Sequence, residues 1–271
     1  MGLSPCPNDT FLFAPLLAGQ VVPPGLQLDF QLADVQELNT LLAAGELDVG
    51  KASFATALQL AERYGVLRVG SALGFGVGPL LLARAGFPRE ARPRTLLCPG
   101  AGTTATWLLS CLHPEWCRPG SGVELRQVRF DTIMPALQRG EADAGLAIHE
   151  GRFTWERSGL QLLEDLGTRW EQLTGGPLPL GGLLARRDLG AAVHAALTEA
   201  LSASLAAARA DPQRALPVMR RHAQELDDDV LWQHVELYVN DHTRDLGPVG
   251  RRALQELAAR SGADRRLEIL G

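Results

Sequence analysis

One histidine of this sequence stands where a reacting group would be presented. His149 ends the apolar run Ala144–Ile148, and an imidazole is the side chain best matched to proton transfer near neutral pH. Single histidines are more often structural than catalytic. The residue type and position therefore make His149 a candidate for general acid–base chemistry, with a structural role as the alternative.

A second group of residues supplies hydrogen-bond donors and acceptors beside predicted strands. Lys51 directly follows an apolar run, where a lysine is otherwise poorly placed. Thr103 and Thr104 begin a predicted helix, whose first N–H groups and hydroxyls suit a carboxylate. Surface exposure, plain helix caps and turn chemistry are the alternative explanations. The residues expected to bind a substrate are Asn8, Asp9, Lys51, Ala52, Ser53, Thr103, Thr104 and Ala105.

Several common site motifs are absent. Gly74, Gly76 and Gly78 form G-x-G-x-G, but they precede a predicted strand instead of opening a helix, which is not the dinucleotide-binding arrangement. No phosphate loop and no G-x-S-x-G nucleophile elbow occurs. Neither the six histidines nor the four cysteines have metal-ligand spacing, so we expect no metal site. The cysteines are expected to be small buried thiols.

The composition limits the classes of protein to which this chain can belong. The chain has 271 residues, 46% hydrophobic and 21% charged, with a net charge of −5, which is typical of a soluble globular protein. A negative surface does not attract nucleic acid or anionic membranes, so an anionic ligand needs a local cluster of donors. We expect a cytoplasmic protein, because the N-terminus lacks signal-peptide features and no apolar run approaches the roughly 20 residues of a membrane span. A monomer and a homodimer both remain open.

Short apolar runs alternate with amphipathic runs over the first two-thirds of the chain, which predicts β-α units around a mainly parallel sheet. Asp34 and Glu37 form a capping box for a helix that Gly45 closes. The expected strands are Leu26–Gln31, Leu47–Gly50, Gly78–Arg84, Thr95–Cys98, Glu124–Phe130, Ala144–Ile148 and Pro179–Arg186. The further expected helices are Ser53–Arg63, Thr103–Leu112, Asp131–Arg139, Ala191–Arg209, one beginning at Pro212, Asp227–Val239 and Val249–Arg260.

A short internal sequence repeat indicates that these elements form two lobes. The segments Leu41–Gly50 and Ala136–Gly145 share G-E-x-D-x-G in register, and a turn bearing Pro and Thr precedes each by a similar distance. We read Gly78–Arg84 and Pro179–Arg186 as hinge strands. The prediction is a discontinuous first lobe, residues 1–80 plus 180–271, and a second lobe of residues 81–179, with ligand-binding strand ends meeting in an interlobe cleft.

Two motifs carry a resemblance to a known family. S-P-C-P-N-D-T-F at Ser4–Phe11 and I-H-E-G-R-F-T-W at Ile148–Trp155 resemble the signature pair of the 1,4-dihydroxy-6-naphthoate synthases of menaquinone biosynthesis. Shorter matches, including H-V-E-L-Y-V-N at His234–Asn240, extend the similarity through nearly the whole chain. Residues 113–122 form an apparent loop insertion, and the first motif lies so near the first residue that part of an N-terminal strand is expected to be missing.

The resemblance implies both a fold and a reaction. The fold is α/β and periplasmic-binding-protein-like (type II), with two lobes, a cleft and a helical C-terminal region. The reaction is a carbon–carbon lyase step that converts cyclic dehypoxanthinylfutalosine to 1,4-dihydroxy-6-naphthoate and a three-carbon fragment, dihydroxyacetone, with no metal and no organic cofactor. In this family the K-x-S segment and the helix-start threonine bind substrate, and the histidine accepts a proton. These roles fall on Lys51–Ser53, Thr104–Ala105 and His149.

Two other functions are the alternatives to this reaction. Chorismate dehydratase, an enzyme of the same pathway, shares the two-lobe plan, but the two signature motifs argue against it. A non-catalytic solute-binding protein would share the fold, but such proteins are normally exported and no signal peptide is visible.

Overall fold

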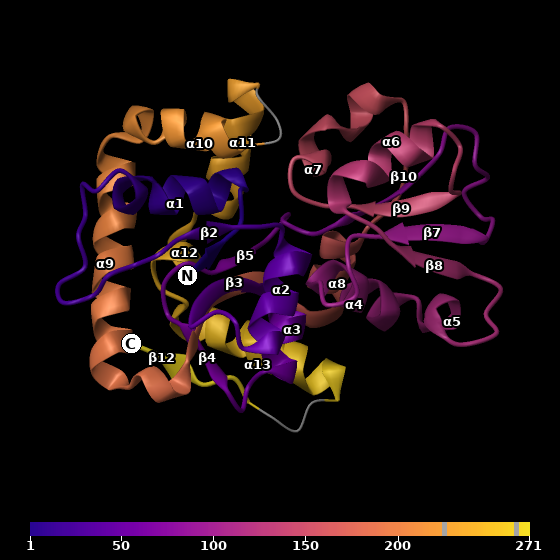
Figure 1. Cartoon of the computed structure of the whole chain (residues 1–271). Helices are drawn as coiled ribbons and strands as arrows, with labels where there is room; N and C mark the ends of the chain where they lie inside the picture. Colours follow the sequence, from indigo (N-terminus) through magenta and orange to yellow (C-terminus); the bar gives the residue numbers. More distant parts are fainter. Residues whose placement is uncertain (224–226, 263–265) are drawn as a thin grey trace. The chain divides into compact units, whose positions relative to one another are not determined.

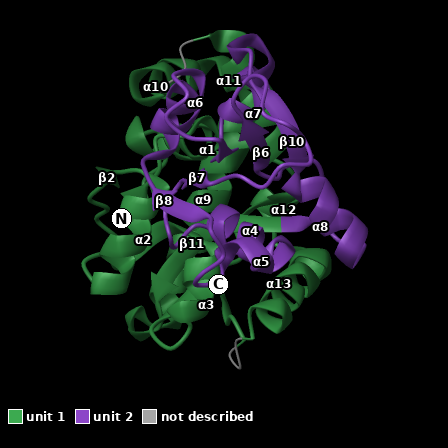
Figure 2. Ribbon diagram, turned by 90° about the vertical axis from the view of Figure 1, so that its right-hand side faces the viewer, with its two compact units in different colours: residues 1–74, 179–271 green, residues 75–178 purple. Residues whose placement is uncertain are grey.

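The chain divides into two compact units that each contain their own sheet. The computed structural model of the protein describes residues 1–223, 227–262 and 266–271. Unit 1 consists of Met1–Gly74 and Pro179–Gly271, and unit 2 of Phe75–Leu178 (Figure 2). Residues 75–80, which the sequence analysis placed in the first lobe, lie in unit 2 in this division.

The sheet of unit 1 has the order β12-β4-β11-β3-β1-β2, with β5 also paired to β11. Strand β1 is parallel to both of its neighbours, whereas β11 runs antiparallel to β3 and β4. The strands are β1 (Gly2–Leu3), β2 (Gln31–Leu32), β3 (Val49–Ser53), β4 (Tyr64–Leu67), β5 (Ala72–Gly74), β11 (Leu178–Arg186) and β12 (Ile269–Leu270).

Helices α1 and α9 pack together in the core of unit 1, beside α10 and α11 (Figure 1). Helix α9 is long and apolar enough to cross a membrane by length and composition, contrary to the expectation that no run approaches this length. Its residues Leu201 and Leu205 belong to the same buried cluster as Leu12 and Phe13 of α1, so α9 packs here as a core helix. The helices are α1 (Pro7–Leu17), α2 (Val35–Ala44), α3 (Phe54–Gln59), α9 (Ala191–Ala210), α10 (Leu216–His222), α11 (Asp228–Tyr238), α12 (Asp241–Arg244) and α13 (Gly247–Ser261).

The sheet of unit 2 has the order β10-β6-β9-β7-β8. Strand β7 is parallel to β8 and β9, and β6 is antiparallel to β9 and β10. The strands are β6 (Leu80–Ala83), β7 (Thr95–Cys98), β8 (Glu124–Gln127), β9 (Ala144–Ala147) and β10 (Gln161–Asp165). The helices are α4 (Thr104–Leu112), α5 (Pro114–Cys117), α6 (Ile133–Gln138), α7 (Gly151–Thr154) and α8 (Leu166–Thr174).

The two sheets share one strand order, which explains the internal repeat in the sequence. In unit 1, β1 lies between β2 and β3, and the antiparallel β11 follows β3; in unit 2, β7 lies between β8 and β9, and the antiparallel β6 follows β9. The order β2-β1-β3-β11 therefore matches β8-β7-β9-β6. The two G-E-x-D-x-G segments lead into β3 and β9, which hold equivalent places. Helices α1 and α4 likewise follow the equivalent strands β1 and β7.

Most predicted elements occur, but several bounds were wrong. The run Leu26–Gln31 is not a strand before Gln31; it alternates because Leu26, Leu28 and Phe30 pack on the core without ladder pairing. The helix after Ser53 ends at Gln59, well before Arg63.

The predicted strand and helix around residue 130 are both shorter than expected. Strand β8 stops at Gln127 instead of Phe130, and a 3₁₀ turn, Phe130–Thr132, precedes α6. The predicted hinge strands β6 and β11 are internal strands of their own sheets.

The capping signals were more accurate than the strand bounds. Asp34 accepts a hydrogen bond from the backbone N of Glu37, and Gly45 ends α2 in the left-handed conformation with φ 79°. The sequence around α2 therefore predicted both of its ends.

Candidate functional site

A buried ion pair joins β3 to the first turn of α1 in unit 1. Lys51 Nζ donates to Asp9 Oδ1 at 2.6 Å and to the carbonyl oxygen of Gly70 at 3.1 Å. Lys51 is 6% exposed and Asp9 2%. A buried ammonium requires such a partner, because desolvation of an isolated charge costs several kcal/mol. The positive charge that was expected to draw in an anion is thus compensated within the protein.

Two further side chains hold Asp9 in place. Asn8 Nδ2 lies 3.0 Å from Asp9 Oδ1, and Asn8 Oδ1 lies 3.0 Å from His234 Nε2. A carboxylate only accepts, so Asn8 must donate through its nitrogen and accept through its oxygen, and His234 must carry its proton on Nε2. Within the described part of the chain, the buried Asp9 Oδ2 has no hydrogen-bond partner. Asp9 therefore has one acceptor oxygen that the described residues leave unused.

Ser53 is held by a residue that the sequence analysis missed. Asn39, 3% exposed on α2, accepts from the Ser53 backbone N at 2.9 Å and donates to Ser53 Oγ at 3.2 Å. Ser53 occupies the N-cap position of α3 but makes no side-chain cap bond there. A signal was present, because asparagine at a core-facing position of an amphipathic helix needs a buried polar partner.

In unit 2, a threonine pair begins α4. Thr103 Oγ1 donates to the carbonyl of Gly100 at 2.7 Å and accepts from the backbone N of Thr106 at 3.2 Å. Thr103 is therefore the helix cap, whereas Thr104 and Ala105 lie in the first turn and are buried. The positive end of the helix dipole favours an anion at that turn.

Cys98, which lies beside this turn, is a poor nucleophile. Burial raises the pKa of the Cys98 thiol to about 12, although a hydrogen bond with Thr106 acts in the opposite direction. A thiol of that acidity forms almost no thiolate at neutral pH, so Cys98 is unsuited to nucleophilic attack. Cys6 is buried like Cys98, as expected, but Cys111 and Cys117 are only half-buried.

His149 has an unusual backbone conformation. Its φ is 54°, and among the described residues it is the only non-glycine residue with a positive φ. Its ring lies edge-on to Phe130, with centroids 4.8 Å apart and an interplanar angle of 71°. Backbone strain of this kind costs on the order of 1 kcal/mol or more and gathers at functional sites. The geometry thus singles out the same histidine that the sequence did.

Each unit brings its predicted residues to one edge of its sheet. The carboxyl ends of adjacent parallel strands share an edge. In unit 1, β1 and β3 are such a pair. Strand β1 leads to Asn8 and Asp9 in the first turn of α1, and Lys51–Ser53 are the last three residues of β3. In unit 2, β7 and β9 lead to Thr103–Ala105 and to His149. The fold therefore brings the predicted residues of each unit to one sheet edge, and their role in binding or catalysis stays a prediction.

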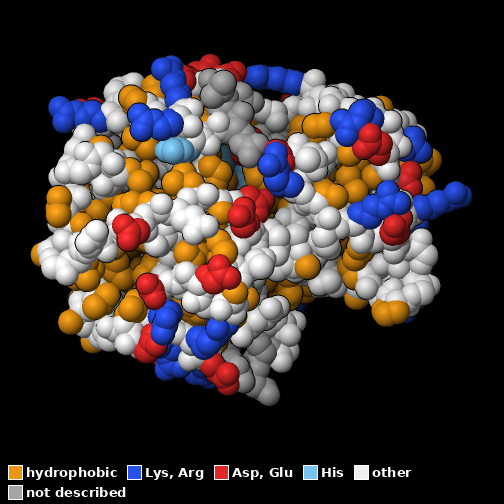
Figure 3. Space-filling model, viewed as in Figure 1, with side chains coloured by type: hydrophobic (Ala, Val, Ile, Leu, Met, Phe, Trp, Pro, Cys, Tyr) orange, Lys and Arg blue, Asp and Glu red, His pale blue; other side chains and the backbone are white. Residues whose placement is uncertain are grey.

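Two further observations concern possible metal ligands and the distribution of surface charge. Among the residues that the structure describes, no group of three or more His, Cys, Asp or Glu side chains could hold a metal ion. On the face drawn in Figure 3, basic and acidic side chains lie interspersed in small groups. Anion binding on this chain therefore needs a local arrangement of donors such as the start of α4.

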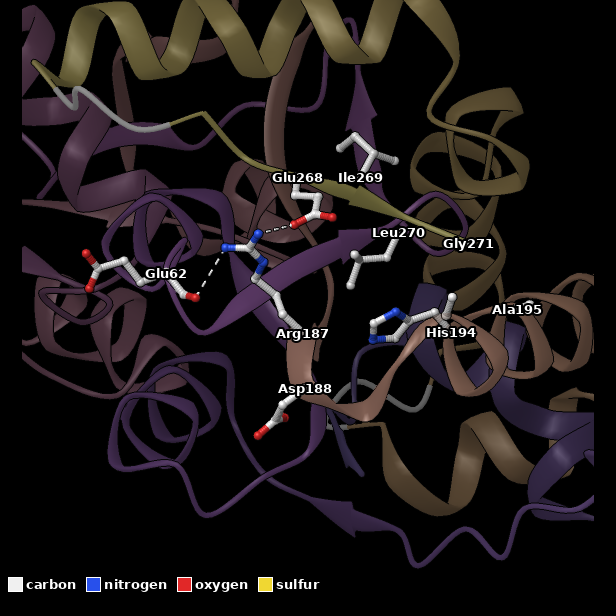
Figure 4. A pocket seen from close by; sticks show the side chains of 10 residues that line it. Glu62, Arg187, Asp188, His194, Ala195, Glu268, Ile269, Leu270 and Gly271 are labelled. Atoms are coloured by element: carbon white, nitrogen blue, oxygen red, sulfur yellow. Dashed lines mark hydrogen bonds and ion pairs between the residues drawn. The ribbon is translucent and has the colours of Figure 1, made fainter.

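A separate pocket of unit 1 contains none of the predicted residues (Figure 4). Arg187 crosses it to form an ion pair with Glu268 at 2.6 Å, and His194 and Ile269 also line it. His194 Nε2 already bonds the carbonyl of Arg186 at 2.8 Å. The Arg187 and Glu268 charges compensate one another, and Asp188 is paired with Arg186, so these charges are already neutralised within the protein.

Similarity to known proteins extends over nearly the whole chain. Residues 1–263 match the model of the menaquinone biosynthesis family. The chain is 47% identical over 264 residues to 1,4-dihydroxy-6-naphtoate synthase of Thermus thermophilus, covering 97% of this chain and 93% of that protein. It is 43% identical over 268 residues to the enzyme of the same name from Streptomyces coelicolor, covering 99% and 94%.

Solved structures agree in fold. A crystal structure of a protein from Archaeoglobus fulgidus superposes with a TM-score of 0.86 at 28% identity, covering 97% of this chain and 96% of that one. The periplasmic aliphatic sulphonate binding protein SsuA of Escherichia coli superposes with a TM-score of 0.63 at 13% identity, covering 99% and 89%. The second likeness shows that the fold is periplasmic-binding-protein-like, as the sequence predicted.

Proposed function

Because this chain belongs to the menaquinone biosynthesis family, we propose that it is a 1,4-dihydroxy-6-naphthoate synthase, a carbon–carbon lyase that acts on cyclic dehypoxanthinylfutalosine. The products are 1,4-dihydroxy-6-naphthoate and dihydroxyacetone. The observation that carries the proposal is 47% identity over 97% of the chain to an enzyme of this name. The enzyme acts in the cytoplasm on a small anionic substrate, without a metal or an organic cofactor.

His149 is the general base in this proposal. Proton removal from the substrate starts the electron flow that breaks the carbon–carbon bond and makes the bicycle aromatic. A neutral imidazole takes that proton at physiological pH, and the imidazolium returns it to the departing fragment. Aromaticity supplies the driving force, so the protein has mainly to position the base and exclude water. The fixed, left-handed backbone of His149 suits such a positioned group.

The start of α4 binds the substrate carboxylate. The first turn of this nine-residue helix places Thr104 and Ala105 at the positive end of the dipole. Thr103 is engaged as the cap, which fixes the turn before substrate arrives.

Unit 1 binds a hydroxyl-bearing part of the substrate. The Lys51 ammonium is occupied by Asp9, so this cluster has no spare positive charge to offer a carboxylate. The available acceptor is Asp9 Oδ2, which suits a hydroxyl donor. Ala52 and Ser53 follow Lys51 in β3, and the Ser53 hydroxyl, which accepts from Asn39, can still donate its own proton. Asn8 orients the carboxylate.

Incubation with cyclic dehypoxanthinylfutalosine tests the proposal. Purified protein should convert this compound to 1,4-dihydroxy-6-naphthoate and dihydroxyacetone, both identified by mass spectrometry. Chorismate is the matched control substrate and should be left unchanged. Turnover of chorismate, or tight binding of the futalosine derivative with no product, would contradict the assignment.

A further inference from the structure

The segment that carries His149 contains a second charged residue, Arg152, which contacts two other parts of unit 2. Arg152 Nη1 donates to the carbonyl of Gly78 at 2.8 Å, and Nη2 donates to Asp165 Oδ2 at 2.7 Å. The side chains of Arg152 and Asp165 are 16% and 20% exposed, so this pair is better shielded than a typical surface ion pair. A guanidinium can bind two acceptors at once because its donors form a rigid fork.

Both acceptors are themselves fixed. Asp165 Oδ1 caps α8 by accepting from the backbone N of Gly167 at 2.9 Å and of Thr168 at 3.1 Å. A Cβ built on Gly78 would lie 2.2 Å from the Cα of Gly167, so the two backbones are in direct contact. The Gly78 carbonyl and the Asp165 carboxylate thus belong to one tightly packed junction at the start of α8.

Arg152 connects the turn that contains His149 to this junction. The backbone N of Arg152 donates to the carbonyl of His149 at 3.2 Å, so the two residues close one turn of chain. The positive φ of His149 is unfavourable for a residue with a Cβ and persists only where surrounding contacts hold it. Phe130 contacts the ring itself, whereas Arg152 is bonded to the backbone of this turn and, through its side chain, to the junction.

We propose that Arg152, with Asp165 as its partner, is the positioning residue that holds His149 in its reactive orientation. The inference rests on the proposed role of His149 as general base. Arg152 touches no reacting atom in this account; it acts through the turn that it anchors. Small displacements of a positioned base are costly, since a shift of about 1 Å can lower a rate by about a hundredfold.

Two substitutions separate this role from a general effect on folding. Arg152→Lys keeps the charge but cannot donate to both acceptors in the same geometry. Asp165→Asn keeps an oxygen to cap α8 and removes the negative charge that holds Arg152. Each should lower kcat by about tenfold to a hundredfold while KM changes little. The double variant should be no worse than the poorer single variant, because both changes break one contact.

The control is Arg139→Lys, which alters an exposed ion pair with Glu141 in the same unit and should leave kcat unchanged. The second measurement is the NMR signal of the His149 ring, which should shift in the Arg152 and Asp165 variants but not in the control. Thermal unfolding confirms that each variant is folded. A wild-type kcat in folded Arg152→Lys and Asp165→Asn, or an unshifted His149 signal, would overturn the inference.

The inference and the proposed function fail in different ways. If His149→Asn is inactive while Arg152→Lys is fully active, His149 is the base and Arg152 does not position it. If His149→Asn retains full activity, the role proposed for His149 is wrong and the inference falls with it.

Discussion

Lys51 Nζ lies 2.6 Å from Asp9 Oδ1, with the two side chains only 7% and 2% exposed. These residues are 42 positions apart in the sequence, and β1 and β3 bring them to one edge of the sheet of unit 1. Their pairing changes what unit 1 can recognise. A lysine that looked like an anion receptor holds a carboxylate of its own protein, and the acceptor left over is Asp9 Oδ2.

Removal of Lys51 should therefore destabilise the fold. Lys51→Met leaves the Asp9 carboxylate buried without its counter-charge, and breaking a buried pair in this way costs about 3–5 kcal/mol. The double variant Lys51→Met, Asp9→Asn should lose less stability than Lys51→Met alone, because no uncompensated charge remains. Urea unfolding monitored by circular dichroism measures both. Equal stability of Lys51→Met and the wild type would show that the pair contributes nothing.

The two threonines at the start of α4 should respond differently to substitution. Thr103→Ala removes the cap bond to Thr106 and should lower the free energy of unfolding by about 1 kcal/mol. Thr104→Val should instead raise KM by about tenfold to a hundredfold, the equivalent of losing one hydrogen bond to a charged group. Thermal unfolding and steady-state kinetics on both variants test this. The reverse pattern would make Thr104 a structural residue only.

The sequence predicted the plan of each unit better than its contacts. The capping residues Asp34 and Gly45 marked α2 correctly, because caps act within a few residues. The strand prediction at Leu26–Gln31 failed because alternation reports which side chains face the core and not whether the backbone pairs. Long-range partners such as Lys51 with Asp9, or Ser53 with Asn39, depend on the tertiary fold. Residue type alone could not reveal them.

The buried thiol of Cys98 should make the protein sensitive to alkaline pH. An unfolded-chain thiol titrates near pH 8.5, whereas burial raises the pKa of folded Cys98 to about 12. Below about pH 8.5 the thiol is protonated in both states and its contribution is fully present. Above that pH only the unfolded state loses the proton, so the free energy of unfolding falls, by at most about 1.4 kcal/mol per pH unit.

The matched variant is Cys98→Ala, which has no thiol to titrate. Between pH 8 and pH 10 the wild type should lose more stability than this variant, as measured by urea unfolding at each pH. A constant stability difference across that range would mean that the Cys98 pKa is not raised by folding.

Substitution of His149 tests the central claim most directly. His149→Asn keeps polarity and approximate size but removes the base, so kcat for formation of 1,4-dihydroxy-6-naphthoate should fall by about 10²–10⁴-fold, with substrate binding preserved. Wild-type kcat should also fall at acidic pH, because an imidazolium cannot accept a proton, and the variant should lack this acidic fall. The decisive measurement is kcat of the wild type and His149→Asn with cyclic dehypoxanthinylfutalosine across pH. A variant with near-normal kcat and an unchanged pH profile would contradict the account.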